Sequence, residues 1–282
     1  MRVALVTCTD LPEPDPDREL LAAALAAAGV DARWLAWNDP ATAAAWGAYD
    51  LAVLRSTWDY HHHLAAFLAW AEAATRATTL LNPVAVVRAN AHKGYLLALA
   101  ARGVPVTPTA LVAQTRPEPL ARLAATRGWR DVVVKPAVSA GSHATYRVRA
   151  DDPAAEGHLA AVLAHGDALV QPYLDAVESS GERALVWIDG AFTHAVRKSP
   201  RFSGDAERVT GPLPIADDER AVAARALAPL AADLLYARVD LCRDAAGAPL
   251  VMELELVEPS LFLAEHPPAL SRLVAAIVRR QR

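Results

Sequence analysis

A stretch near the end of the chain alternates acidic and apolar residues in a way that could hold a metal ion. Residues 250–259 spell LVMELELVEP, with apolar positions that favour a strand and a proline that ends it. The strand period of two predicts that Glu253 and Glu255 share one face. Two carboxylates about 7 Å apart repel each other. A hard divalent cation such as Mg²⁺ would relieve this repulsion, because it prefers oxygen ligands and often retains phosphates as partners. The opposite face would carry Leu250, Met252, Leu254 and Leu256.

A second polar-faced segment lies just upstream. Residues 235–242 place Tyr236, Arg238 and Asp240 at alternating positions, and the link 243–249 has the turn residues of a hairpin. Pairing these two strands would bring Asp240 beside Glu253 and Glu255, which we predict as metal ligands. The alternative is a hairpin whose outer face is simply solvated. The apolar neighbourhood favours the metal site.

The chain has 28 lysines and arginines, of which only Lys93, Lys135 and Lys198 are lysines. An ammonium group is a compact point charge that suits a phosphate oxygen. Lys135 ends an apolar strand, predicted at 132–136, and therefore needs a partner. The loop that follows, residues 137–145, has small side chains that let backbone N–H groups approach phosphate oxygens. Lys93 stands at a predicted helix start, where a solvated lysine is the alternative.

Residues 55–60, RSTWDY, directly follow a predicted strand. Ligands in open parallel sheets bind beyond the carboxyl ends of strands. The guanidinium, hydroxyls, aromatic plane and carboxylate of this segment could contact both ends of an amino acid, with Asp59 as a substrate contact. The alternative is a helix N-cap, with Thr57 or Asp59 capping and Trp58 packing. Residues 61–63, three histidines, are predicted as a solvated helix start, because adjacent residues on a helix do not converge.

Composition limits the function classes. The chain has 282 residues, 54% hydrophobic content and a net charge of −4, which provides no basic field for nucleic acid or a membrane surface. Cys8 and Cys242 are expected to be reduced core thiols of a cytoplasmic protein. The first residues are not expected to be a signal peptide, and no apolar run is long enough to predict a membrane span.

Strand–helix alternation over the first 80 residues predicts a small open α/β unit with a parallel sheet. Its strands are expected at 3–7, 31–37 and 50–57, and its helices at 18–28 and 62–76. Asp189-Gly190 predicts a hairpin between strands 181–188 and 191–198. Residues 199–212 are predicted to be a lid loop, with Arg201 and Arg208 meeting phosphate on closure. Further helices are expected at 90–101, 117–127, 152–164, 217–235 and 266–280, and further strands at 145–148 and 168–174.

Taken together, these features resemble the ATP-grasp superfamily. The resemblance rests on Lys93, Lys135, the small-residue flap, a hinge at 171–174 and an acidic residue opening a hairpin, Glu182, followed by Asp240 and Glu253. It implies an N-terminal α/β unit (1–83) and two α+β subdomains (84–174 and 175–282) that clamp ATP. Either Glu178 or Glu182 would contact the ribose. The implied ATP-binding residues are Lys93, Lys135, Ser139, Ala140, Gly141, Ser142, Gln171, Pro172, Tyr173, Leu174, Glu178 and Glu182.

Within that superfamily, residues 55–60 and 253–261 are similar to the cyclo-ligases that act on O-ureidoserine in cycloserine biosynthesis. Glu253-x-Glu255 departs from the Glu-x-Asn of most members. The resemblance implies two Mg²⁺ ions, with Mn²⁺ as an option, and catalytic roles for Arg238, Arg197 and Lys198. The implied substrate-binding residues are Arg55, Ser56, Thr57, Trp58, Asp59, Tyr60 and Arg201.

The implied activity is ADP-forming ligation: a carboxylate is activated as an acyl phosphate and joined to a nitrogen, within one molecule or between two. The alternatives are a dipeptide-type ligase, a catalytically silent ATP-binding module and a kinase that stops at the acyl phosphate. The expected partner is an amino-acid-like small molecule, and a homo-oligomer stays open.

Overall fold

The computed structural model describes residues 1–199 and 208–280 of the chain and contains three sheets. The first is the predicted parallel sheet, with strand order β2-β1-β3-β4. Its strands are β1 (Arg2–Thr7), β2 (Asp31–Ala36), β3 (Leu51–Ser56) and β4 (Thr79–Leu81), and its helices are α1 (Arg18–Ala27) and α2 (Leu64–Ala77). Of the strands in this sheet, only the short β4 was not predicted.

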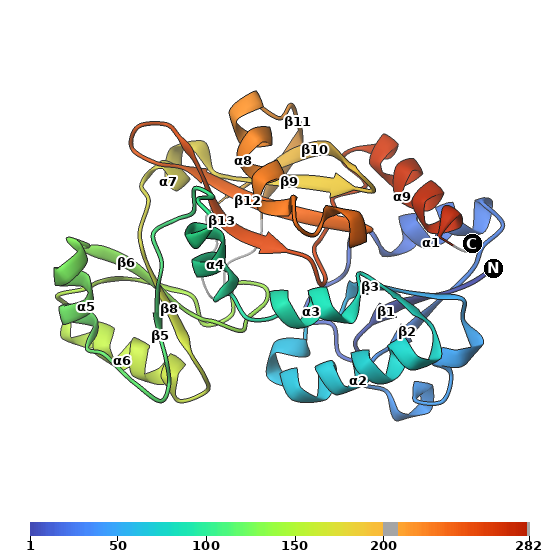
Figure 1. Cartoon of the computed structure of the whole chain (residues 1–282), viewed down its shortest axis with the longest axis horizontal. Coiled ribbons are helices and arrows are strands. Elements are labelled where there is room, and N and C mark those ends of the chain that lie inside the picture. Colours follow the sequence, from blue (N-terminus) through green and yellow to red (C-terminus); the bar gives the residue numbers. More distant parts are fainter. Residues whose placement is uncertain (200–207, 281–282) are drawn as a thin grey trace.

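The second sheet is antiparallel, with the order β5-β8-β6-β7. It comprises β5 (Ala110–Val112), β6 (Asp131–Pro136), β7 (Tyr146–Arg149) and β8 (Ala168–Pro172), covered by α5 (Leu120–Arg127) and α6 (Pro153–Leu163). Val132 and Val134 of β6 are fully buried. Asp152 caps α6 by accepting a hydrogen bond from the Ala154 backbone at 2.8 Å, with Pro153 in the first turn. Figure 1 shows this sheet and its two helices as a separate lobe at the left.

The third sheet has the order β11-β10-β9-β12-β13. Its members are β9 (Glu182–Ile188), β10 (Ala191–Lys198), β11 (Val209–Leu213), β12 (Tyr236–Arg243) and β13 (Pro249–Glu255). Asp189 and Gly190 have φ values of 46° and 91°, which a hairpin turn with two left-handed residues requires. The prediction of a patternless loop over 199–212 was wrong at its end, because β11 pairs with β10 there.

The remaining helices differ from expectation in length and number. They are α3 (Val84–Asn90), α4 (Tyr95–Ala101), α7 (Ala176–Ser180), α8 (Asp217–Leu227) and α9 (Pro267–Arg279). The helix predicted over 217–235 is shorter, since a proline at position 229 cannot continue it. None of the described helices is both long enough and apolar enough to cross a membrane.

Each sheet lies within one of the three predicted ranges, but the packing crosses those ranges. Leu96 and Leu99 of α4 pack in one core with Leu185 and Leu254 of the third sheet. The C-terminal helix α9 contacts α1 of the N-terminal unit, and Figure 1 shows the two side by side. The boundaries at 83 and 174 therefore stay a prediction, and the three units share continuous cores.

Strands β12 and β13 pair as predicted, in a register that places Asp240 opposite Glu253 and Arg238 opposite Glu255. The register then shifts at a β-bulge: Asp240 pairs with Glu253 and Leu241 with Val251, so Met252 is an extra residue in β13. The residues of β13 before Glu253 therefore point to the face opposite to the one expected. Val251 is fully buried, whereas Met252 lines a cavity beside Glu253. The prediction that Met252 lies on the apolar face was therefore wrong.

Two buried asparagines hold the end of β13 in place. The Asn90 side chain donates to the Leu254 carbonyl and accepts from the Leu256 N–H, both at 2.8 Å, as a neighbouring strand would. The Asn82 amide donates to the carbonyls of Tyr236 and Leu256 at 2.9 and 2.7 Å. These bonds satisfy buried backbone groups and fix where the carboxylates of β13 point.

Candidate active site

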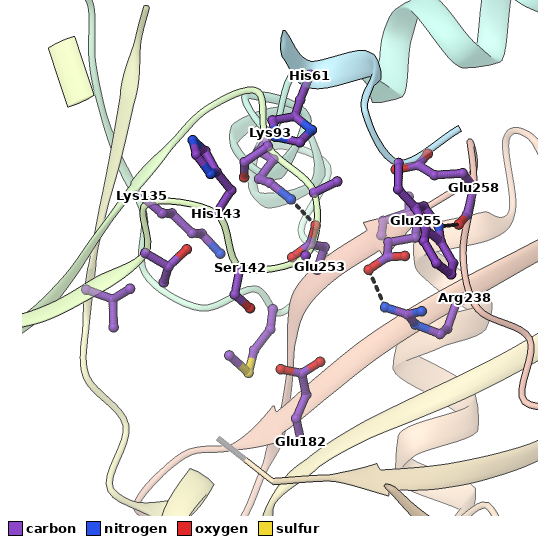
Figure 2. Close-up of a pocket in the computed structure, with 18 of the residues that line it drawn as sticks. His61, Lys93, Lys135, Ser142, His143, Glu182, Arg238, Glu253, Glu255 and Glu258 are labelled. Atoms are coloured by element: carbon purple, nitrogen blue, oxygen red, sulfur yellow. Dashed lines mark hydrogen bonds and ion pairs between the residues drawn. The ribbon is translucent and has the colours of Figure 1, made fainter. Parts of the chain in front are cut away.

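A cavity of about 420 Å³ lies where the three sheets meet, a size typical of small-molecule sites. Trp58 and Tyr60 reach it from the N-terminal unit, and Lys135 reaches it from the second sheet. Figure 2 shows Arg238, Glu253 and Glu255 facing the same space from the third sheet. The predicted convergence of distant segments on one cavity is therefore present.

An ion-pair network on β12 supports the floor of this cavity. Arg238 donates to both Asp240 oxygens, at 2.8 and 2.9 Å, and the Lys198 ammonium lies 2.7 Å from Asp240 Oδ2. Burial would raise the pKa of Asp240, but Arg238 and Lys198 hold it well below its usual range. Lys198 also pairs with Glu182. Asp240 and Lys198 lie beneath the cavity lining, where they orient Arg238 and Glu182.

The carboxylates above this network carry surplus negative charge. Lys93 pairs with Glu253 and Arg238 pairs with Glu255, while burial raises the pKa of Glu255 to about 7. Burial also raises the pKa of Glu258, which has no ion pair in the described part of the chain. Among the described residues, five carboxylates of the cluster (Glu182, Asp240, Glu253, Glu255 and Glu258) lie near four cations (Lys93, Lys135, Lys198 and Arg238). A donor set of clustered oxygens with excess charge fits Mg²⁺.

Lys135 is the cation of the cavity whose charge is not matched within the described residues. Its side chain is buried, and no described residue forms an ion pair or hydrogen bond with its ammonium group. Burial lowers the pKa of Lys135, and the charge of Glu253 offsets this only in part. A buried, unpaired ammonium facing a cavity is suited to an anionic ligand.

The flap loop, residues 137–145, follows Lys135 and lines the cavity as predicted, with Ser139, Ala140, Gly141 and Ser142. Gly141 has a φ of 58°, a left-handed conformation that glycine adopts without strain. All four hinge residues predicted at 171–174 also line the cavity. Gln171 is fixed by a 2.9 Å hydrogen bond from its amide to Thr109 Oγ1.

Of the two glutamates left open for the ribose, only Glu182 lines the cavity. Burial raises the pKa of Glu182 to about 7. Glu178 is exposed on α7, where Arg147 donates to it at 2.7 Å and the Tyr173 hydroxyl at 2.9 Å. The prediction that Glu178 binds ATP is therefore wrong in this structure.

Arg197 was also predicted wrongly as a cavity residue. It alternates with Lys198 on β10, so the two side chains point to opposite faces of the sheet. Lys198 is buried near Asp240, whereas Arg197 is exposed and donates to the Ser179 carbonyl at 2.8 Å. Arg201 lies outside the described residues, and Arg208 is exposed.

Most of the segment 55–60 supports the fold and does not line the cavity. Arg55 is buried, with its guanidinium 3.6 Å from Asp17 and 3.3 Å from the Pro259 carbonyl. Asp59 accepts hydrogen bonds from Trp37 Nε1 at 2.7 Å and from Asn38 Nδ2 at 2.6 Å. The predicted substrate contacts of Arg55 and Asp59 are therefore corrected.

The other residues of segment 55–60 also divide into those that support the fold and those that line the cavity. Ser56 bonds the Thr7 hydroxyl at 3.0 Å, and Thr57 is fully buried. Neither Thr57 nor Asp59 acts as a helix cap, because no side-chain capping hydrogen bond is made where the short helix Tyr60–His62 begins. Trp58 and Tyr60 do line the cavity, and Trp58 Nε1 donates to the Glu258 carbonyl at 3.0 Å.

Two sets of cavity residues were missed as site residues by the sequence analysis. Glu258 and Ser260 lie just after β13, within the segment 253–261 that carries the resemblance to cyclo-ligases, but neither was assigned to the site. His61 and His62 line the cavity together with His143 of the flap loop. The prediction of a solvated helix start fails for His61, which is half-buried.

Comparison with known proteins agrees with this geometry. A family model for the N-terminal domain of D-cycloserine synthetase DcsG matches residues 3–82. The cycloserine biosynthesis protein DcsG of Streptomyces lavendulae is 36% identical over 300 residues, covering 99% of this chain and 98% of that protein. The crystal structure of D-cycloserine synthetase DcsG superposes with a TM-score of 0.90 at 33% identity, over 100% of both chains.

More distant solved structures share the fold. A D-alanine–D-alanine ligase from Bacillus anthracis gives a TM-score of 0.71 at 16% identity, covering 100% of this chain and 97% of that one. The ATP-grasp ligase PsnB gives 0.65 at 19% identity, over 98% and 99%. Structures of these two proteins were solved with ATP and with Mg and ADP, respectively.

The fold and the cavity define this chain as an ATP-grasp ligase, an enzyme class that uses ATP and Mg²⁺ to join a carboxylate to a nitrogen. Within that class the chain belongs to the DcsG family, because the likeness extends over its whole length. The predicted superfamily, fold class and ligase activity are thereby confirmed.

Proposed function

We propose that this enzyme cyclises an amino acid of the O-ureidoserine type, forming ADP. The likeness to the cycloserine biosynthesis protein is the main support for this proposal. It covers 99% of the chain and therefore includes the segments that line the cavity. The cavity supports it with a phosphate-binding side and an amino-acid side. The free thiols of Cys8 and Cys242 are compatible with the cytoplasmic location that we also propose.

The phosphate-binding side is built around Lys135. Its unpaired ammonium, together with Lys93 and the backbone of the flap loop, would hold the phosphate groups of ATP. The hinge residues 171–174 would border the base, and Glu182 would lie near the ribose. Binding of the phosphates removes the electrostatic penalty of burying an unmatched lysine.

Glu253 and Glu255 would hold Mg²⁺, and we propose two ions, with Mn²⁺ as a possible substitute. The metal, when bound, neutralises phosphate charge and so favours phosphoryl transfer. Asp240, which the sequence analysis predicted as a third metal ligand, lies beneath the cavity lining and accepts hydrogen bonds from Arg238 and Lys198, so we propose that it acts by fixing these two residues. The departure from Glu-x-Asn at this strand adds the carboxylate that Arg238 contacts.

The amino-acid side lies between Trp58, Tyr60 and Glu258. Glu258 faces the cavity with no counterion in the described part of the chain, so it would accept the ammonium group of the substrate. The substrate carboxylate would then lie toward Arg238, where its attack on the γ-phosphorus depends on positioning. Arg238 would stabilise the acyl phosphate and the oxyanion formed when the substrate nitrogen attacks. Phosphate leaves as the ring closes.

The test is mass spectrometry of products after incubation with ATP, Mg²⁺ and either hand of O-ureidoserine, beside a panel of amino acids. We expect ADP and a cyclised product from O-ureidoserine. A linked product from two amino acids would instead indicate an intermolecular ligase. ADP release with a hydroxamate trapped by hydroxylamine but no ligated product would indicate a kinase. ATP binding without turnover on any substrate would indicate a silent module.

A further inference from the structure

Three histidines from two distant segments converge at one edge of the cavity. His61 and His62 come from the short helix after β3, and His143 comes from the flap loop. One ring nitrogen from each lies within 4.8 Å of the others. The ring centroids of His143 are 5.2 Å from His61 and 5.1 Å from His62. Figure 2 shows His61 and His143 beside Lys93.

The environment keeps the His61 ring neutral and leaves it without partners. Both of its ring nitrogens are buried and make no hydrogen bond in the described structure. Burial and the neighbouring His62 and His143 rings lower the pKa of His61 to about 4, and the nearby Trp58 backbone offsets this only in part. Burial likewise lowers the pKa of His143. Buried ring nitrogens without hydrogen bonds are unusual, and neutral imidazole is the form that binds metal ions.

We propose that His61, His62 and His143 bind one transition-metal ion of the Zn²⁺ type. Zn²⁺ binds imidazole nitrogen at about 2.0–2.1 Å, which places tetrahedral ligands about 3.3 Å apart. Small side-chain rotations would bring the three nitrogens from within 4.8 Å to that spacing. A water molecule would complete the tetrahedron, because the described residues offer three ligands at this place.

This site differs in chemistry from the carboxylate site. Imidazole prefers Zn²⁺, whereas carboxylates and phosphate prefer Mg²⁺. The charge of nearby Lys93 opposes cation binding, but its ion pair with Glu253 reduces that effect. The bound ion would connect the flap loop to the N-terminal unit across the cavity edge. Slower release of nucleotide is the expected consequence; it rests on the proposed function, whereas metal binding does not.

The binding test uses the full chain, stripped of metal and then saturated with Mg²⁺ and ADP to occupy the carboxylates. Zn²⁺ is titrated in competition with a chromophoric chelator. We expect one ion per chain, and at least about tenfold weaker binding in His143→Ala and in His62→Ala. His63→Ala is the matched control: His63 is exposed and adjacent but outside the cluster, so binding should equal that of the parent.

Cobalt absorption provides a second measurement that does not depend on activity. A tetrahedral site of three imidazoles should give visible bands with Co²⁺ in the parent and in His63→Ala, but not in His143→Ala. Circular dichroism checks that each variant is folded. Unweakened binding in His143→Ala, equal loss in His63→Ala, or displacement of the ion by Mg²⁺ and ADP would overturn the proposal. The first two results would leave the ligase function untouched, because they concern only the histidines.

Discussion

The two polar segments that the sequence singles out, residues 55–60 and 250–259, differ sharply in what they contribute. In the second, Glu253, Glu255 and Glu258 all face the cavity. In the first, Arg55 and Asp59 are bonded inside the N-terminal unit or to the Pro259 carbonyl, and only the two aromatic residues reach the cavity. Two segments with similar densities of polar residues thus differ: one lines the cavity, and the other mainly supports the fold.

The difference follows from where the residues lie relative to their strands. Alternate residues of a regular strand point to the same face, so the period correctly groups Glu253 and Glu255 of β13, which lie beyond the bulge. Residues that follow a parallel strand have no such constraint, and here the chain after β13 covers the end of β3. Trp58 and Arg55 donate to the carbonyls of Glu258 and Pro259, so the first segment holds the second in position.

Loss of the Arg55 ion pair should produce the largest effect, and it should act on stability. Arg55 and Asp17 both have side chains that are 1% exposed, and Asp17 accepts hydrogen bonds from the Leu261 and Leu263 backbones. Arg55→Ala leaves a buried carboxylate without its cation, so we expect a loss of about 3–5 kcal/mol in the free energy of unfolding. Chemical denaturation measures it.

A paired substitution separates charge from shape. Arg55→Met combined with Asp17→Asn removes both charges and keeps the volume, and it should recover part of the lost stability. Recovery is incomplete because an amide nitrogen cannot accept one of the two backbone hydrogen bonds that the Asp17 oxygens accept. If Arg55→Ala instead folds as stably as the parent and raises the KM for the amino acid, Arg55 belongs to the substrate site. The contrast between the two segments would then be wrong.

Glu253→Gln should have the largest effect on activity, with a smaller loss of stability than Arg55→Ala because the Glu253 side chain is 24% exposed. The amide keeps the size of the side chain but removes the charge that faces Lys93 and the metal position. We expect turnover to fall by at least about a hundredfold, with a higher Mg²⁺ concentration needed for half-maximal rate. Steady-state kinetics against Mg²⁺ concentration provide the measurement, and an unchanged Mg²⁺ dependence would remove Glu253 from the metal site.

Periodicity and burial account for what was predictable in the fold and the site. The alternation of β12 and β13 correctly placed Asp240 opposite Glu253, and the apolar run before Lys135 correctly implied a buried lysine. The Asp-Gly turn and the parallel N-terminal sheet were likewise encoded by local patterns. Each of these features depends on residues close together in the sequence.

Three of the failures share one physical cause, which is contact between segments far apart in the chain. Arg55 was assigned to substrate because its partner Asp17 lies 38 residues away and its carbonyl partner more than 200 away. The bulge that turns Met252 into the cavity depends on pairing with β12. His61 and His143 meet only once the flap loop is folded against the N-terminal unit.

Asp59→Asn should have a smaller effect that again contrasts the two segments. The substitution weakens the acceptors used by Trp37 Nε1 and Asn38 Nδ2, so we expect a loss of about 1–3 kcal/mol in stability. The KM values for ATP and for the amino acid should stay within about twofold, because Asp59 lies outside the cavity lining. A raised KM for the amino acid alone would restore Asp59 as a substrate contact.

The smallest predicted effect is a change in the pH dependence of stability through Glu258. Burial raises the pKa of Glu258 above its ordinary value of 4.5, so the folded state binds more protons than the unfolded state above that pH. Its contribution to stability is therefore fully present below about pH 4.5 and is lost as pH rises through the folded pKa. His61 and His194 act oppositely: burial lowers the pKa of each from 6.5 to about 4, so their contribution is lost as pH falls through that range.

The pH dependence of stability from Glu258 partly cancels that from His61 and His194. The informative quantity is therefore the difference in stability between the parent and Glu258→Gln. Without metal or nucleotide, the variant should gain stability relative to the parent as pH rises from about 5 to about 8, since it no longer has a carboxyl group to ionise in a buried place. Denaturation midpoints across that range measure the difference. If the parent and Glu258→Gln give parallel pH curves, Glu258 is not an unmatched carboxyl group. It would then be removed as the proposed acceptor for the ammonium group of the substrate.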